Sequence, residues 1–166
     1  HSYFLQHNIQ RILRSDLSFN AVDTRPMGIE IVPTNATIGV EIRGVDLSKP
    51  LDDETFAEIE TAFDTHGVII FRDQSITPEQ QIFFCGRFGE VAINHNAKDF
   101  GIAGNPEIYL ISNIEENGRA IGTPRAGSEW HTDMSYAERP ARATMLHAIE
   151  VPALNGLALG DTEFAN

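Results

Sequence analysis

The spacing of apolar residues changes along the chain, and this change restricts the folds that the sequence can adopt. One segment with helical spacing opens at Asp52/Asp53 and stops at Gly67, and a second opens at the capping sequence Thr77-Pro78-Glu79-Gln80 and runs to about Phe88. Short apolar runs typical of strands surround them, at 29–32, 38–42, 68–71, 108–112 and 144–151. Helices early in the chain, followed by strands with long loops, predict an α+β fold built on a β-sandwich or barrel.

The first residues differ from the rest and suggest a separate leader. Apolar residues between positions 3 and 17 have nearly helical spacing, with Arg11 and Arg14 among them, so we expect a helix there. It is either a docking helix or an appended segment. The second reading is favoured because Met27 would make a natural protein start and residues 16–26 have the composition of a linker. The chain therefore divides into a leader or linker of uncertain status at 1–26 and a domain at 27–166.

Composition limits the partners that the chain can bind. The 166 residues suffice for one domain, and a formal net charge of −12 disfavours nucleic acid and anionic membranes. Cys85 is the single cysteine, which excludes an internal disulfide and a cysteine-rich zinc site and fits a reducing, cytoplasmic location. The sequence holds no apolar run of membrane-helix length. The class of partner that is left is a small-molecule substrate. Arg125 or Arg139 could bind such a substrate if it is an anion, although a solvated surface position is the simpler interpretation of both arginines.

The tripeptide His131-Thr132-Asp133 is the strongest candidate for a chemical site. Residues two apart project from the same face of an extended backbone, so the imidazole and the carboxylate can meet at one point. This pair supplies two thirds of the two-histidine, one-carboxylate triad that holds non-haem Fe(II) and leaves positions open for O2. Such a triplet alone is more often a hydrogen-bonded surface pair. Its neighbours favour a site, because Trp130 and Tyr136 could exclude bulk water and a long loop precedes it.

Further segments follow one another in an order and at a spacing that resemble a known family. They are Val68-Ile69-Ile70-Phe71-Arg72-Asp73-Gln74, Thr77-Pro78-Glu79-Gln80-Gln81, Arg87-Phe88-Gly89-Glu90, residues 129–136, Pro140, Pro152 and Gly160-Asp161-Thr162-Glu163-Phe164. From about residue 29 to 166 the chain resembles the taurine dioxygenase / dichlorophenoxyacetate dioxygenase (TauD/TfdA) family of Fe(II)- and 2-oxoglutarate-dependent oxygenases. The resemblance implies a double-stranded β-helix, a cupin-like jelly roll, with flanking helices and C-terminally incomplete in this chain.

The resemblance also implies roles for individual residues. His131 and Asp133 match the first two iron ligands of the family. Thr162 matches the threonine that hydrogen-bonds a carboxylate of 2-oxoglutarate. The family usually has Gly-Gly-Asp-Thr here, whereas this chain has Leu159-Gly160-Asp161-Thr162, reached through a slightly longer segment.

Two residues that the resemblance requires have no match before Asn166. They are a second iron-binding histidine and the arginine that pairs with 2-oxoglutarate, both of which lie beyond the Gly-Asp-Thr motif in the family. The remaining histidines do not replace the first: His147 lies in an apolar strand, His66 ends a helix, and His1 and His7 are in the leader. We therefore expect the N-terminal part of a larger enzyme, inactive by itself.

As a whole, the resemblance implies an enzyme that hydroxylates a small organic substrate with O2, while 2-oxoglutarate is converted to succinate and CO2 at Fe(II). Asn94 falls near a family position that contacts substrate, and His95 is its neighbour, so both are candidates for substrate contact. Two alternatives stay open: a non-catalytic jelly-roll binding module, or another metal enzyme on a cupin-like barrel. The identity of the substrate does not follow from the sequence, and a homo-oligomer is compatible with it.

Overall fold

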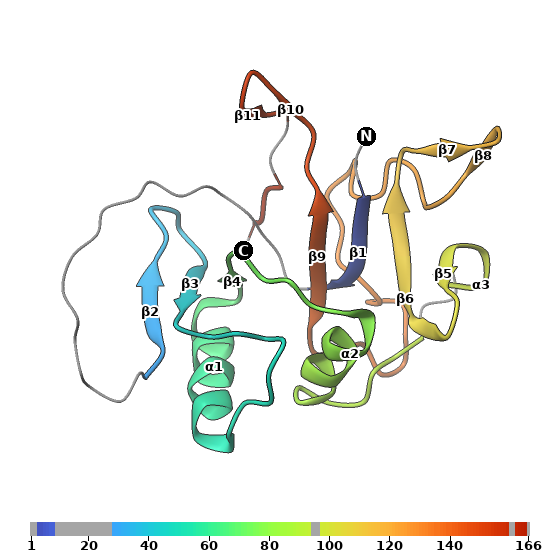
Figure 1. The fold of residues 1–166 in the computed structure, drawn as a ribbon. Coiled ribbons are helices and arrows are strands. Elements are labelled where there is room, and N and C mark those ends of the chain that lie inside the picture. The colour runs from blue at the N-terminus through green and yellow to red at the C-terminus, as the bar shows by residue number, and fades with distance from the viewer. Residues whose placement is uncertain (1–2, 9–27, 94–96, 160–161, 166) are drawn as a thin grey trace.

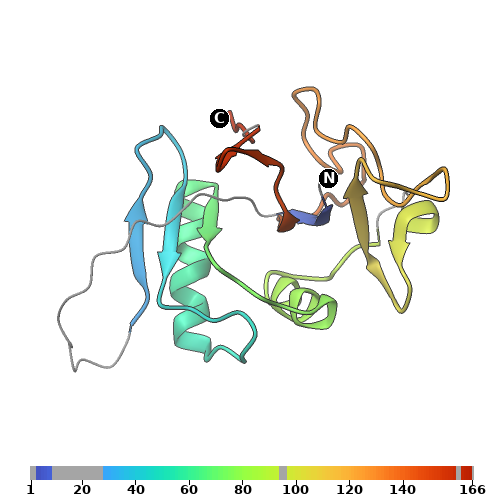
Figure 2. The same ribbon diagram turned by 45° about the horizontal axis from the view of Figure 1, so that its top comes forward.

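A computed structural model describes residues 3–8, 28–93, 97–159 and 162–165 of the chain. The described residues form two main sheets that lie side by side, with one long helix against the first sheet and a shorter helix against the second (Figure 1). The turned view in Figure 2 shows the shorter helix between the two sheets. The contact between the two helices therefore decides how the sheets are placed.

The first sheet holds β2 (Glu30–Pro33), β3 (Val40–Arg43) and β4 (Ile69–Phe71), in that order. β2 and β3 form an antiparallel hairpin, and β3 pairs in parallel with β4. Parallel neighbours need a crossover, which α1 (Asp53–His66) supplies. The strands predicted at 29–32, 38–42 and 68–71 are confirmed, with small shifts at their ends.

Local signals define the ends of the helices, as predicted. The Asp52 carboxylate caps α1 by accepting a hydrogen bond from the Thr55 amide at 2.7 Å, and Gly67 ends the helix in the left-handed conformation at φ 69°. α2 (Pro78–Gly86) begins with a full capping box. In this box the Thr77 hydroxyl and the Gln80 side-chain oxygen each accept a hydrogen bond from the other residue's backbone N–H.

An edge-to-face cluster of phenylalanines joins the two helices. Between ring centroids, Phe56 of α1 lies 4.9 Å from Phe88 and 6.2 Å from Phe84, and Phe63 and Phe71 extend the cluster from α1 and β4. Phe88, predicted as the last residue of α2, lies just beyond its end. Such pairs contribute about 0.5–1.5 kcal/mol each beyond the area that they bury. Buried aliphatic side chains complete the core: Val40, Ile42, Leu47, Ile59 and Ile69.

The second sheet contains β5 (Gly101–Ile102), β6 (Asn105–Ser112), β1 (Tyr3–Asn8) and β9 (Thr144–Glu150), in that order, and all neighbours are antiparallel. The strands predicted at 108–112 and 144–151 are confirmed. The prediction of a helix at 3–17 is wrong for residues 3–8, because these residues form β1. Residues 9–17 lie outside the described residues. A strand between two neighbours satisfies its backbone groups on both sides, which outweighs a weak helical spacing.

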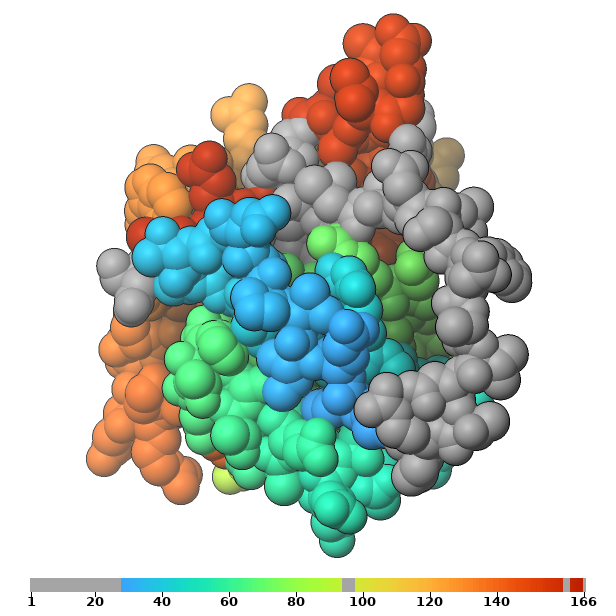
Figure 3. Space-filling model, turned by 90° about the vertical axis from the view of Figure 1, so that its left-hand side faces the viewer, coloured from blue at the N-terminus to red at the C-terminus, as the bar shows by residue number. Residues whose placement is uncertain are grey.

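Short hairpins and a short helix occupy stretches that the sequence suggested were loops. α3 (Ala97–Phe100) and β5 lie in the connection between α2 and β6. β7 (Glu115–Glu116) pairs with β8 (Arg119–Ala120) inside the long loop before His131. β10 (Ala153–Leu154) and β11 (Leu157–Ala158) form a hairpin that projects from the body of the molecule (Figure 3).

The described residues combine helices with small sheets, and the helices flank the sheets as expected. Over these residues the strands do not close into a barrel, so the double-stranded β-helix stays a prediction. Within the same ranges, none of the helices has the length and apolar character needed to span a membrane.

Replacing Phe84 by Ala should lower the free energy of unfolding by about 3–5 kcal/mol, because it removes a buried ring and leaves a cavity among Phe56, Phe71 and Phe88. Phe83→Ala is the matched control: Phe83 precedes Phe84 on α2 and is 61% exposed, so its loss should cost less than about 1 kcal/mol. Urea unfolding curves measure both values. Equal effects of the two substitutions would contradict the assigned buried face of α2.

Candidate metal centre

The segment that carries the candidate metal ligands is anchored on β6. The Thr123 amide donates to the Leu110 carbonyl at 2.8 Å, and the Ser112 amide donates to the Thr123 carbonyl at 3.3 Å. A Cβ on the neighbouring Gly122 would come within 2.6 Å of the Leu110 carbonyl oxygen, so this close approach requires glycine. The stretch from 124 to 143 therefore leaves the sheet from a fixed point.

His131 and Asp133 come together as predicted, although the backbone that joins them is not a regular strand. The imidazole Nε2 of His131 lies 3.3 Å from the Asp133 carboxylate oxygen Oδ1. The other ring nitrogen, Nδ1, lies 2.7 Å from the Glu129 carbonyl oxygen. A carbonyl can only accept, so Nδ1 carries the proton in the neutral ring. Nε2 then presents a lone pair on the side where the carboxylate lies.

This arrangement fits a metal ion that takes one nitrogen and one oxygen ligand. A neutral imidazole and a carboxylate are donors of the iron triad, and a carbonyl behind the imidazole is a usual means of orienting a metal-binding histidine. The side chains of His131 and Asp133 are 51% and 33% exposed, so both remain accessible to an ion. Among the described residues, no three His, Cys, Asp or Glu side chains form a group that could hold a metal.

The aromatic residues on either side of the pair do not enclose it. Trp130 and Tyr136 are 68% and 69% exposed, so the expectation that they exclude bulk water is wrong for the described part of the chain. Met134, directly after Asp133, has a φ of 51°, in the left-handed region that a side chain enters at a cost of about 1–2 kcal/mol. The Ala137 amide closes this turn on the Met134 carbonyl at 2.9 Å, which redirects the chain toward β9.

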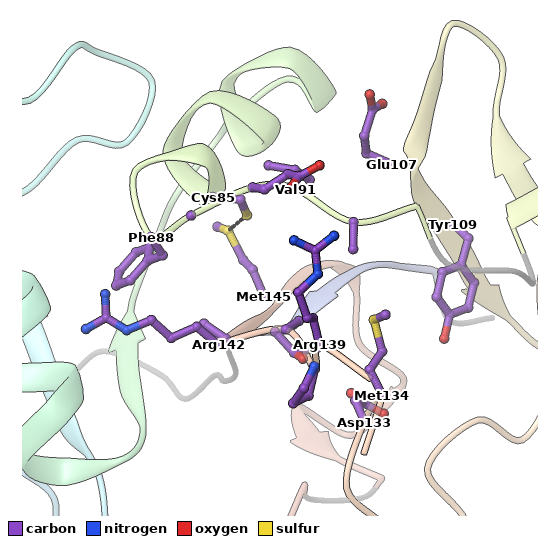
Figure 4. A pocket seen from close by; sticks show the side chains of 17 residues that line it. Cys85, Phe88, Val91, Glu107, Tyr109, Asp133, Met134, Arg139, Arg142 and Met145 are labelled. Atoms are coloured by element: carbon purple, nitrogen blue, oxygen red, sulfur yellow. Dashed lines mark hydrogen bonds between the residues drawn. The ribbon is translucent and has the colours of Figure 1, made fainter. Parts of the chain in front are cut away.

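A cavity of about 430 Å³, which we term the Asp133 pocket, opens beside the ligand pair (Figure 4). It lies between the end of α2, β6 and the segment that leads into β9. The volume suits a small organic molecule. The apolar part of the lining consists of Cys85, Phe88, Val91 and Met145. The remaining lining carries ionisable side chains, namely Glu90, Glu107, Tyr109, Asp133, Arg139 and Arg142.

Tyr109 of β6 lines the same pocket as Asp133. Its side chain is buried, and burial, reinforced by the negative charge of Asp133, raises its pKa to about 12. The phenol therefore stays protonated at neutral pH and can donate a hydrogen bond. Figure 4 shows Tyr109, Met134 and Asp133 at one end of the pocket, with Arg139 extending across its middle.

Ion pairs of Arg142, which lines the Asp133 pocket, attach this part of the lining to α1. The Arg142 guanidinium binds the Asp64 carboxylate at 2.8 Å through Nη2 and binds Glu60 through Nη1. Glu60 and Asp64 lie four residues apart and hence on one face of α1, so a single guanidinium reaches both. The chain between Asp133 and β9 is thus fixed at two points, at the Met134–Ala137 turn and at Arg142.

Of the other residues predicted for the site, the structure describes only Thr162. Thr162 lies exposed in the stretch after β11 and does not line the Asp133 pocket. Asn94 and His95 lie outside the described residues. His147 is partly buried on β9, with Nε2 3.3 Å from the Gln74 carbonyl oxygen, which supports its reading as a sheet residue rather than a ligand.

Most of the chain matches one known protein family. Residues 30–166 match the family described as "Taurine catabolism dioxygenase TauD, TfdA family". The chain belongs to this family. His131, Asp133 and Thr162 all lie within the stretch that matches the TauD/TfdA model, whereas β1 lies outside it.

Individual relatives show the same TauD/TfdA relationship. The chain is 37% identical over 146 residues to a pentalenolactone F synthase of Streptomyces avermitilis, covering 86% of this chain and 46% of that protein. It is 30% identical over 152 residues to an alpha-ketoglutarate-dependent 2,4-dichlorophenoxyacetate dioxygenase of Cupriavidus pinatubonensis, covering 84% and 50%. It is 33% identical over 154 residues to an alpha-ketoglutarate-dependent sulfate ester dioxygenase of Pseudomonas putida, covering 90% and 46%. The chain thus spans about half the length of these relatives.

A solved structure is also similar to part of the chain. The crystal structure of a taurine dioxygenase from Burkholderia xenovorans is 39% identical, with a TM-score of 0.46. The similar region covers 50% of this chain and 29% of that one.

Two residues of the Asp133 pocket, Glu107 and Tyr109, are not among the candidates that the sequence suggested. They lie two residues apart on β6 and hence on one face of the strand. Polar residues at 107 and 109 alternate with the apolar Ile108 and Leu110, and this alternation could have indicated both from the sequence. The Glu129 carbonyl behind His131 has no such signal, because every residue carries a carbonyl.

Gly122→Ala should lower the free energy of unfolding by about 1–3 kcal/mol, because the added Cβ would meet backbone atoms of Leu110 and Ser112 at 2.6 and 2.8 Å. Gly86→Ala is the matched control, since a Cβ on Gly86 would lie 3.8 Å from the Val91 side chain, an ordinary contact. The control should be neutral or slightly stabilising, because alanine favours a helix. Thermal unfolding followed by circular dichroism compares the two. A Gly122→Ala chain as stable as wild type would contradict the anchoring of the loop.

Proposed function

We propose that the protein is an Fe(II)- and 2-oxoglutarate-dependent dioxygenase that hydroxylates a small organic substrate, with release of succinate and CO2. The observation that carries this proposal is the position of His131 Nε2 and Asp133 Oδ1, which lie 3.3 Å apart while the Glu129 carbonyl holds Nδ1. Membership of the TauD/TfdA family and the names of the relatives support the same class of reaction.

In this proposal His131 and Asp133 hold the iron, and Thr162 donates a hydrogen bond to a carboxylate of 2-oxoglutarate. The bound iron supplies the oxidising chemistry, in which O2 and 2-oxoglutarate are consumed and one oxygen atom enters the substrate. The hydrogen bond from Nδ1 to the Glu129 carbonyl would leave the lone pair of Nε2 free to bind the ion. The Asp133 carboxylate would supply a negatively charged oxygen ligand to the cation.

The Asp133 pocket is the proposed space for the substrate. It opens directly beside one iron ligand, and its apolar wall of Cys85, Phe88 and Met145 can exclude water from an organic molecule bound there. The protonated phenol of Tyr109 can orient that molecule by donating a hydrogen bond. Asn94 and His95, on the chain that follows Val91, stay candidates for further contacts with the substrate.

We also propose that this chain forms the N-terminal part of the enzyme. The proposed ligands His131 and Asp133 are two of the three that the triad needs, and the relatives extend over about twice the length that this chain matches. A second histidine and an arginine for 2-oxoglutarate would come from the remainder. The chain by itself should therefore bind iron weakly and should not turn over substrate.

Metal binding by the 166-residue chain tests the assignment of the ligands. Titration with Mn(II), followed by electron paramagnetic resonance, should show weak binding that His131→Ala reduces by about tenfold or more. His66→Ala is the matched control, because His66 lies in the last turn of α1 and should leave the affinity unchanged. Equal affinities of wild type and His131→Ala would contradict the proposal that this histidine is a ligand.

Succinate release tests the reaction. The protein translated from the complete reading frame should release succinate from 2-oxoglutarate only with Fe(II) and O2, and His131→Ala should abolish the release. The 166-residue chain should release no succinate. An active monomer of that length would contradict the proposal that the chain is only the N-terminal part of the enzyme. Turnover that needs metal but neither O2 nor 2-oxoglutarate would indicate a different metal enzyme. Absence of metal binding by the complete protein would indicate a non-catalytic module.

A further inference from the structure

Arg142 joins the segment that carries Asp133 to a helix that lies far away in the sequence. Its guanidinium binds Glu60 through Nη1, and through Nη2 it donates to both carboxylate oxygens of Asp64, at 2.9 and 2.8 Å. These two partners precede Arg142 by 82 and 78 residues. A planar guanidinium that meets two carboxylates is held in one orientation, so this contact, which we term the α1 latch, fixes the backbone at residue 142.

The α1 latch lies at the end of the stretch that forms one side of the Asp133 pocket. This stretch begins at Asp133 and lines the cavity again over residues 139–143. Between them the Ala137 amide closes a turn on the Met134 carbonyl at 2.9 Å, and the ring of Pro140 restricts the backbone further. Little freedom therefore remains between Asp133 and the latch, so that a displacement at one end moves the other.

Arg142 can act on the candidate metal centre through the backbone, and not by touching it. Figure 4 shows its side chain directed toward Phe88 and away from Asp133. If its charge alone mattered, removal of the guanidinium would strengthen the binding of a cation, because like charges repel. The direction in which the metal affinity changes therefore separates positioning from direct electrostatics.

The α1 latch contributes to local order more than to the stability of the whole chain. The side chains of Arg142, Glu60 and Asp64 are 42%, 36% and 57% exposed. Ion pairs between exposed groups add little to the free energy of unfolding, because water screens them and ordering long side chains costs entropy. Buried side chains such as Ile59 hold α1 in the core without the latch. Its loss should leave the chain folded and displace the attached segment.

We propose that Arg142 is a positioning residue, which places Asp133 within reach of the ion that His131 holds by binding Glu60 and Asp64. This proposal rests on the proposed function, since it requires a metal at His131 and Asp133. A group directly behind a metal ligand typically changes the affinity about 10–100-fold. Arg142 acts from farther away, so its loss should weaken metal binding by about three- to tenfold.

Titration of the 166-residue chain with Mn(II), followed by electron paramagnetic resonance, tests the role of Arg142. Arg142→Met should weaken binding by about three- to tenfold while the midpoint of thermal unfolding changes little. Arg142→Lys keeps a charge that can reach one carboxylate and should recover part of the affinity. Arg119→Met is the matched control: Arg119 lies exposed on β8, on the opposite side of the molecule from α1 (Figure 1), and its loss should leave the affinity unchanged.

The carboxylates of α1 allow the latch to be broken from its other side. Glu60→Gln combined with Asp64→Asn should weaken Mn(II) binding to the same extent as Arg142→Met. Adding Arg142→Met to this pair should cause no further loss, because the three side chains act as one unit. Binding by Arg142→Met that equals or exceeds that of wild type would overturn the proposal. Losses that simply add would overturn it as well, since each charge would then act on the ion separately.

Backbone mobility in the metal-free chain separates a failure of the latch from a failure of the proposed function. In ¹⁵N relaxation measurements, Arg142→Met should lower the order parameters of the amides at 134–139 toward the flexible range, below about 0.6, and leave those of α1 unchanged. Unchanged order parameters at 134–139 would overturn the latch whether or not the chain binds metal. A wild-type chain that binds no Mn(II), or whose binding His131→Ala does not weaken, would instead overturn the metal centre and with it the role of Arg142 there.

Discussion

The edge-to-face contacts among Phe56, Phe84 and Phe88 are the interaction on which the rest of the described structure depends. They join α1, which lies against the first sheet, to α2, which lies against the second. Arg87 reinforces the contact, because its guanidinium lies 4.3 Å from the centre of the Phe56 ring and binds Asp53 at 2.7 Å. This packing is therefore a main link between the two sheets.

The candidate metal ligands take their position from the same contact through β6. α2 packs against β6, and β6 provides both Tyr109 in the Asp133 pocket and the Leu110 carbonyl on which the loop is anchored. The loop then returns with His131 and Asp133 facing each other. The spacing of two residues brings the two candidate ligands together, whereas their place in the molecule depends on packing far from them in sequence.

Features that act over a few residues could be predicted from the sequence. Asp52 and Thr77 cap their helices, and Gly67 ends α1, because each acts on backbone groups within its own turn. The nearness of His131 and Asp133 followed from their spacing.

Features that depend on distant partners could not be predicted in this way. Residues 3–8 have a spacing compatible with a helix, and only β6 and β9, far along the chain, make them a strand. The exposure of Trp130 and Tyr136 depends on which segments pack over them, and their own sequence carries no information on that. Tyr109 has a raised pKa because the fold buries it and brings Asp133 near, although many residues separate the two.

Arg142 makes the Asp133 pocket sensitive to ionic strength, in contrast to the aromatic contacts. Its bonds to Glu60 and Asp64 join partly exposed charges, and salt screens such pairs over about 8–10 Å at ordinary concentrations. The phenylalanine rings pack through apolar contact, which salt does not weaken in this way. Rising salt would therefore loosen the wall of the pocket nearest β9 while α1 and α2 stay joined. The pocket could change its shape without unfolding of the domain that carries it.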